Sequence, residues 1–112
     1  MFVSYVVPGH VNTFSGYPLD METIHISWTP PTVTHGNLVG YYLEYQGNSV
    51  DSDSPSPLSV RIPSSSTSYE LGGLYSDTLY NLTLHAENEV GRSEGVSIWL
   101  KTYKHECNEV NN

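Results

Sequence analysis

A chain of 112 residues has the usual size of one compact domain. Its four Lys and Arg residues against twelve Asp and Glu give a formal net charge of -8, which argues against nucleic-acid or anionic-membrane binding because phosphate contacts need clustered basic side chains. Charged residues make up only 14% of the sequence, whereas residue types that favour strands and tight turns are abundant. We therefore expect a single all-β domain.

The N-terminal residues 1–7 are expected to be a leader or an inter-module linker. Residues 2–7 are more apolar than an exposed leader should be. Two interpretations stay open: the run extends the first strand along a sheet edge, or it ends a preceding module or linker. The sequence contains neither a signal-peptide pattern nor an apolar run long enough to span a bilayer, and we expect it to be a piece of a longer protein.

Short runs of alternating apolar and polar residues, separated by turn residues, predict strands rather than helices. The first strand is expected at residues 11–15. In the second, Ile24, Ile26 and Trp28 share one face, and two prolines end the strand because proline donates no ladder hydrogen bond. A turn at residues 35–37 precedes the third strand. Its expected inward positions are Val39, Tyr41, Leu43 and Tyr45.

Four more strands follow a polar loop at residues 47–57, which is too rich in turn formers to be regular. Two short strands, around residues 58–62 and 69–71, are expected at sheet edges. The most regular alternation covers residues 80–86, and the last strand covers residues 96–100. Seven short antiparallel strands of this kind are expected to form a two-sheet sandwich with Greek-key connections.

Four features narrow the fold further: Trp28 precedes Thr-Pro-Pro, Gly40 and Tyr41 open a strand, Leu74 precedes a turn, and Tyr80 begins an apolar alternation. With these features, residues 8–103 resemble a fibronectin type III module. The resemblance implies an immunoglobulin-like topology in which Tyr80 lies in the core above Leu74, with its hydroxyl bonded to upstream backbone. The cysteine pair of immunoglobulin domains is absent. The expected core residues are Trp28, Tyr41, Leu43, Leu74, Tyr80 and Leu82.

Residues 104–112 are expected to form a polar C-terminal tail, which contains the single cysteine, Cys107. A single cysteine cannot form a disulfide within the chain, so stability must come from packing. Cys107 is either an unpaired thiol or half of a bridge to a neighbouring module.

No set of titratable residues has the spacing of a catalytic or metal site. The five histidines are scattered over different predicted strands and loops. Asp51 and Asp53 resemble the start of a calcium loop, but the later glycine and the closing glutamate are missing. No serine lies in a Gly-x-Ser-x-Gly motif. We therefore expect a non-enzymatic domain with no metal and no cofactor.

Asn81, Leu82 and Thr83 form an Asn-x-Thr sequence, which is an acceptor for N-glycosylation. Because Tyr80 and Leu82 point inward, Asn81 should point outward. Such a triplet also arises by chance, in a strand whose outward positions are simply polar. Asn81 is the candidate N-glycosylation site, and its use would place the domain outside the cell.

Trp99 lies between Ile98 and Leu100, which are expected in the core, so it should face solvent. In the strand order that the resemblance implies, Trp99, His85 and Tyr42 lie on neighbouring strands and form an exposed aromatic strip. Aromatic residues are frequent at binding hot spots, but a single exposed tryptophan often only covers neighbouring side chains. Arg92, in the loop before Trp99, either contacts a partner or pairs with a nearby carboxylate. The candidate protein-contact residues are Trp99, Tyr42, His85 and Arg92.

These observations lead to one expected function and two alternatives. We expect a non-catalytic spacer and protein-interaction module of a larger extracellular cell-surface protein, such as an adhesion molecule or a receptor-type tyrosine phosphatase with tandem modules. Its partners would be neighbouring modules of the same chain and a cell-surface protein, and the isolated module is expected to be monomeric and without direct membrane contact. The alternatives are direct ligand recognition through the aromatic strip or the loops at residues 30–37 and 88–95, and an accessory module of a secreted enzyme.

Overall fold

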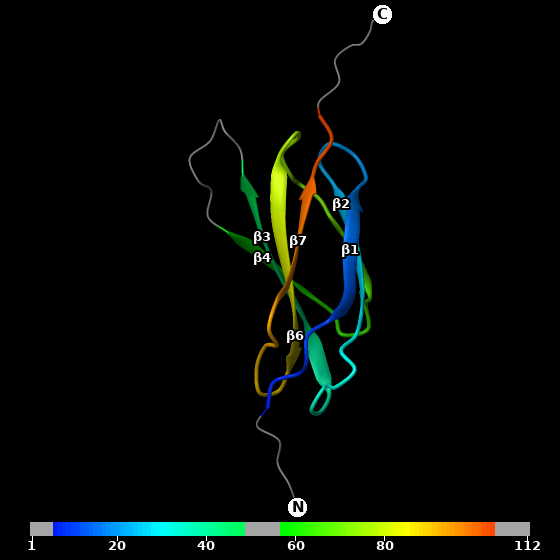
Figure 1. Cartoon of the computed structure of the whole chain (residues 1–112), viewed down its shortest axis with the longest axis vertical. Helices are drawn as coiled ribbons and strands as arrows, with labels where there is room; N and C mark the ends of the chain where they lie inside the picture. Colours follow the sequence, from blue (N-terminus) through cyan, green and yellow to red (C-terminus); the bar gives the residue numbers. More distant parts are fainter. Residues whose placement is uncertain (1–5, 49–56, 105–112) are drawn as a thin grey trace, which may run out of the picture.

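The computed structural model describes residues 6–48 and 57–104, which form seven antiparallel strands in two packed sheets (Figure 1). One sheet has the order β1-β2-β5 and the other β4-β3-β6-β7. The predicted seven-stranded sandwich is therefore confirmed. Within these residues there is no helix long and apolar enough to cross a membrane. The strands are β1 (Asn12–Pro18), β2 (Ile24–Thr29), β3 (Leu38–Asn48), β4 (Leu58–Ile62), β5 (Ser68–Leu71), β6 (Leu79–Asn88) and β7 (Val96–Lys101).

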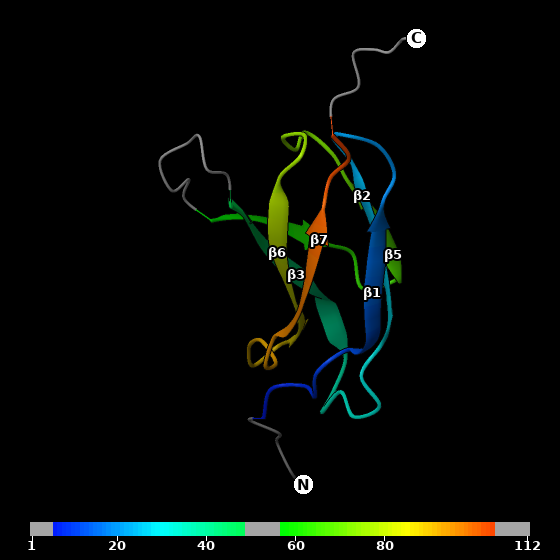
Figure 2. The same cartoon turned by 45° about the horizontal axis from the view of Figure 1, so that its top comes forward.

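The chain passes repeatedly between the two sheets. β3 and β4 pair in the larger sheet, β5 then pairs with β2 in the smaller sheet, and β6 returns to lie between β3 and β7 (Figure 2). The short strands β4 and β5 lie at sheet edges, as the sequence predicts. Because β6 and β3 are the central strands of the larger sheet, their alternating side chains determine both the core and one open outer face.

Two strands differ in extent from the sequence prediction. β1 begins one residue later than expected and continues to Pro18, because it pairs with β2 as far as Ile24. β3 continues through Gly47 and Asn48, which were expected in a loop. A side chain at residue 47 would overlap the ring of Tyr80, its paired residue on β6. Glycine is therefore needed at this position because of packing and not because of a turn. The rest of the predicted loop, residues 49–56, lies outside the described residues.

The predicted inward position of Val39 is wrong. The pairing of β3 with β6 shifts between Leu38 and Gly40, so that one extra residue on β3 is left between two rungs of the ladder. This bulge reverses the alternation, and Val39 is 55% exposed, whereas Leu38 packs against the core. From Gly40 onward the expected alternation returns, with Tyr41 and Leu43 fully buried and Tyr45 half-buried.

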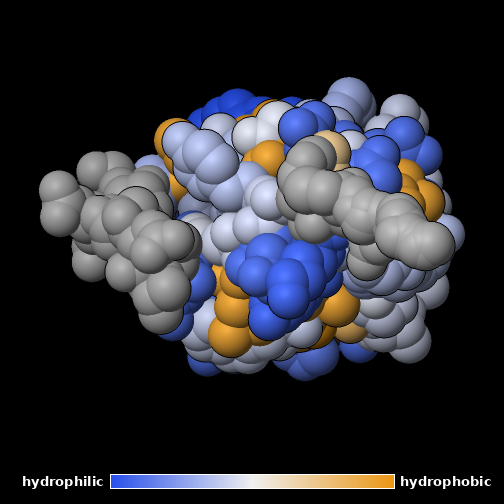
Figure 3. Space-filling view, turned by 90° about the horizontal axis from the view of Figure 1, so that it is seen from above, coloured by the Kyte–Doolittle hydropathy of each residue, from blue (hydrophilic) through white to orange (hydrophobic). Residues whose placement is uncertain are grey.

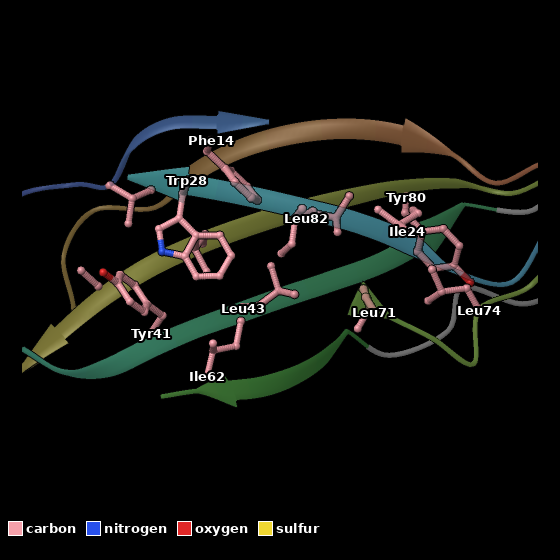
Figure 4. Packing of buried hydrophobic residues seen from close by; sticks show 14 residues of the cluster. Phe14, Ile24, Trp28, Tyr41, Leu43, Ile62, Leu71, Leu74, Tyr80 and Leu82 are labelled. Atoms are coloured by element: carbon pink, nitrogen blue, oxygen red, sulfur yellow. The ribbon is translucent and has the colours of Figure 1, made fainter. Parts of the chain in front are cut away.

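The core lies between the two sheets, and Figure 4 shows its largest side chains pointing toward one another. The rings of Trp28 and Tyr41 meet edge to face with centroids 5.2 Å apart. At the other end of the core, the Tyr80 hydroxyl accepts a hydrogen bond from the backbone N–H of Tyr75 at 2.9 Å, beside Leu74. All six expected core residues are buried. Burial raises the pKa of the Tyr41 and Tyr80 hydroxyls above its usual range.

Candidate interaction face

The outer face of the β4-β3-β6-β7 sheet carries all four candidate contact residues. Antiparallel pairing arranges its side chains in rows across the strands. The first row holds Gln46, Asn81 and Trp99, on β3, β6 and β7. The next row holds Glu44, Thr83 and Ser97, and a third row holds Arg61, Tyr42 and His85, on β4, β3 and β6.

Tyr42 is covered by two arginines that a single carboxylate holds in place. The Arg92 guanidinium lies 3.6 Å from the centre of the Tyr42 ring, and that of Arg61 lies 5.9 Å from it. Glu87 accepts from Arg92 Nε at 3.0 Å and from Arg61 Nη1 at 3.1 Å through its two separate oxygens. We call these four residues the arginine–tyrosine cluster. It combines cation–π contact with charge-assisted hydrogen bonds on a largely buried glutamate.

His85 connects this cluster to the neighbouring row. Its Nδ1 lies 2.9 Å from the Ser93 carbonyl oxygen and its Nε2 lies 3.0 Å from Glu44 Oε1, while its ring lies 6.1 Å from that of Tyr42. Both hydrogen-bond partners are acceptors, so both bonds form together only when both ring nitrogens carry a proton. With 17% of its side chain exposed, His85 holds the β6–β7 loop against β3 rather than presenting a ring to solvent.

The aromatic strip is therefore divided into two parts. Tyr42, His85 and Arg92 come together at one end of the face, where the arginine covers the tyrosine ring. Trp99 stands at the other end, beyond the row of Thr83 and Ser97, and is 58% exposed. The outward orientation of Trp99 agrees with the alternation in the sequence. Whether any of these residues contacts another protein stays a prediction.

Sequence reasoning missed three participants in this site. Glu87 and Arg61 are 26 residues apart and belong to different strands. Alternation places each side chain outward but does not say which outward side chains meet. Of these two residues, Glu87 was the easier to identify from the sequence. The alternation of β6 places it outward, and Arg92 follows in the next loop. Gly95 was also missed. A side chain there would overlap Thr83 and His85, so this glycine lets the β6–β7 loop close on the sheet.

Glu87→Gln is expected to lower the free energy of unfolding by about 1–3 kcal/mol, since an amide keeps the shape but removes the charge that holds both guanidiniums. Arg61→Ala should cost less than about 1 kcal/mol, because the Arg61 side chain is largely exposed. Urea unfolding of the two variants beside the wild-type protein measures the difference. Equal losses would contradict a central role for Glu87.

Asn81 borders a small open pocket of about 190 Å³ on the β3 side of its strand. Its Oδ1 accepts a hydrogen bond from the Thr83 hydroxyl at 3.4 Å. Tyr45 also borders this pocket, and its ring packs against the core, where burial and the nearby Tyr69 and Tyr80 raise the pKa of its hydroxyl. The pocket is lined by Glu44, Tyr45, Gln46, Pro57, Asn81 and Thr83.

The described residues contain no group of three or more His, Cys, Asp or Glu side chains that could hold a metal ion. Of the charged residues on the face, Arg61 and Arg92 form ion pairs with Glu87, and Glu44 lies within hydrogen-bond distance of His85 Nε2. Cys107 and the acidic pair at residues 51 and 53 lie outside the described residues.

Comparisons with known proteins agree with this architecture. A family model described as fibronectin type III domain matches residues 10–102. The FN5 domain of Drosophila Lar superposes with a TM-score of 0.73 at 25% sequence identity, covering 88% of this chain and 100% of that one. The fn3 domain of the human collagen alpha-1(XX) chain superposes with a TM-score of 0.76 at 22% identity, covering 99% of this chain and 100% of that one.

Proposed function

Because the chain belongs to the fibronectin type III family, whose domains are commonly modules of extracellular or multidomain proteins and generally non-catalytic, we propose that it is a spacer and protein-interaction module of a cell-surface receptor or adhesion protein. It acts outside the cell as a monomeric unit, with neighbouring modules of its own chain and a cell-surface protein as partners. A net charge of -8 supports partners other than nucleic acid.

The observation that carries this proposal is the position of the two ends of the described chain. The described chain enters at one pole of the sandwich, with the β2–β3 and β6–β7 loops, and leaves at the opposite pole, with the β1–β2 and β5–β6 loops (Figure 1). Modules joined through opposite poles extend into a rod. A unit of this shape separates its neighbours by its own length.

Both poles also carry exposed apolar side chains. At the first pole they are Val6, Val7, Val33 and Val90. Figure 3 shows the second pole from above, with orange apolar patches among hydrophilic side chains. The exposed large side chains of the segments at this pole include Leu19, Tyr75 and Tyr103. The Tyr103 N–H donates to the Asp20 carbonyl and the Tyr103 carbonyl accepts from Asp77, so the outgoing chain is held against this pole. Side chains of this kind support contact with adjacent modules of the same chain.

A module exchange in the parent protein tests the spacer role. Deleting residues 8–103 should reduce binding of the parent to its cell-surface partner, and replacing them with an unrelated fibronectin type III module of equal length should restore it. The end-to-end dimension of the parent, measured by small-angle X-ray scattering, should shorten only in the deletion. If the replacement fails as the deletion does while the scattering dimension is restored, this module's own surface is required for binding, and spacing alone is rejected as its function.

The exposure of Trp99 favours direct ligand recognition as a second candidate function. In this case the parent protein that carries the replacement module would not bind its partner in the exchange experiment. Binding of the multimerised module to a panel of cell-surface ectodomains would also be lost on Trp99→Ala or Arg92→Ala. Circular dichroism would show that each variant keeps its fold.

A further inference from the structure

Asn81 and Trp99 are direct cross-strand neighbours. They are paired residues of β6 and β7, and both side chains point to the outer face of the larger sheet. Directly opposed residues of an antiparallel pair have Cβ atoms about 4.5–5.5 Å apart. Any group that is attached to the amide nitrogen of Asn81 therefore begins within reach of the indole.

Trp99 is far more exposed to solvent than the other tryptophan, Trp28. Trp28 is buried against Tyr41, whereas Trp99 is 58% exposed and makes no ring contact with another described residue. Its neighbours on the outer face of β7 are Ser97 and Lys101, whose side chains are small or charged. The ring of Tyr42 lies two rows away on this face, under Arg92. More than half of the surface of Trp99 is thus open to solvent.

The two sides of Asn81 differ in chemistry. On the β3 side lie Gln46 and the polar pocket, and on the β7 side lies the indole. A pyranose ring has an apolar face of C–H groups, which carry partial positive charge, and a polar rim of hydroxyls. The negatively charged face of an indole attracts such C–H groups, while the hydroxyl rim stays in water. The β7 side therefore offers a first sugar its better contact.

We propose that Asn81 carries an N-linked glycan and that its first N-acetylglucosamine packs on the indole of Trp99. The Asn81-Leu82-Thr83 sequence supplies the acceptor, and the cross-strand pairing places the indole of Trp99 beside it. The exposed tryptophan is then part of a modification site, and the sugar shields it from protein partners. This proposal rests on the proposed function in one respect only: both require that the chain passes through a secretory pathway.

Secretion of the 112-residue chain from cultured mammalian cells tests the proposal, with high-mannose glycans trimmed enzymatically to a single N-acetylglucosamine. Intact mass should show that Asn81 is occupied. Acrylamide should quench tryptophan emission less in the one-sugar protein than in the same chain made in bacteria, because Trp28 is buried in both and only Trp99 changes. The one-sugar form should melt about 4 °C or more above the bacterial form.

Matched variants separate stacking from a general effect of the sugar. In Trp99→Ala the increment in melting temperature should vanish, whereas in Lys101→Ala, one row away on the same face, it should remain. An unmodified Asn81 in secreted protein would overturn the proposal, as would equal quenching with and without the sugar. The quenching comparison uses only the wild-type sequence, so it holds even if a variant does not fold. None of these readouts depends on the module exchange, so each proposal can fail separately.

Discussion

Trp28→Ala is expected to lower the free energy of unfolding by about 3–5 kcal/mol. Trp28 fills the space between the sheets beside Tyr41, and its removal leaves a cavity that the flanking strands cannot close. Because domains of this size are stable by about 5–15 kcal/mol, the loss is a large fraction of the total. Urea unfolding, followed by far-ultraviolet circular dichroism, measures it.

Trp99→Ala in unglycosylated protein is the matched control, because it removes the same side chain from the open face of the same sandwich. It should change the free energy of unfolding by no more than about 0.5 kcal/mol. The two variants therefore test the assignment of inside and outside directly. Similar losses for both would contradict the placement of Trp28 in the core and of Trp99 on the surface.

For most strands, the sequence was sufficient to predict which side chains point into the core and which point to solvent. Alternation fixed Tyr41, Leu43 and Leu82 as inward and Trp99 as outward, because one buried face per sheet enforces a period of two. It failed at Val39, where a bulge adds one residue to β3 and reverses the alternation. A bulge is a property of a strand pair, so it cannot be read from one strand's pattern.

The site was less predictable than the fold for a related reason. The resemblance brought Tyr42 and His85 onto neighbouring strands, and the structure places their rings together. The role of Arg92 depends on Glu87, and that contact exists only once the β6–β7 loop folds back on the sheet. Outward polar residues were visible in the sequence, but the choice of partner among them follows from strand register and loop path.

The same limit applies to Asn88, the last residue of β6. Nothing in its residue type or in the alternation separates it from the loop that follows, yet its side chain is buried where the incoming chain and two loops meet. Its Nδ2 lies within hydrogen-bond distance of the carbonyls of Val6, Thr34 and His35. Its Oδ1 accepts from the backbone N–H groups of Val90 and Gly91. One amide thus fixes the conformation of the pole at which the chain enters.

Asn88→Asp is expected to lower the free energy of unfolding by about 2–4 kcal/mol, because an oxygen replaces the donating nitrogen and faces three carbonyls at 2.9–3.2 Å. The loss should shrink as the pH falls and the introduced carboxyl is protonated, since a protonated carboxyl donates again. Urea unfolding at several pH values measures both effects. Amide hydrogen exchange should show faster exchange at Val90 and Gly91 in the variant.

Asn12→Asp provides the control for this substitution. The Asn12 amide makes a single, solvent-accessible hydrogen bond of 3.3 Å to the Pro30 carbonyl, so its loss should cost less than about 1 kcal/mol. If Asn88→Asp were no more costly than Asn12→Asp, the pole would be held by its apolar contacts rather than by this amide. The expected difference instead makes Asn88 the residue that holds the incoming chain at Val6 to both loops of that pole.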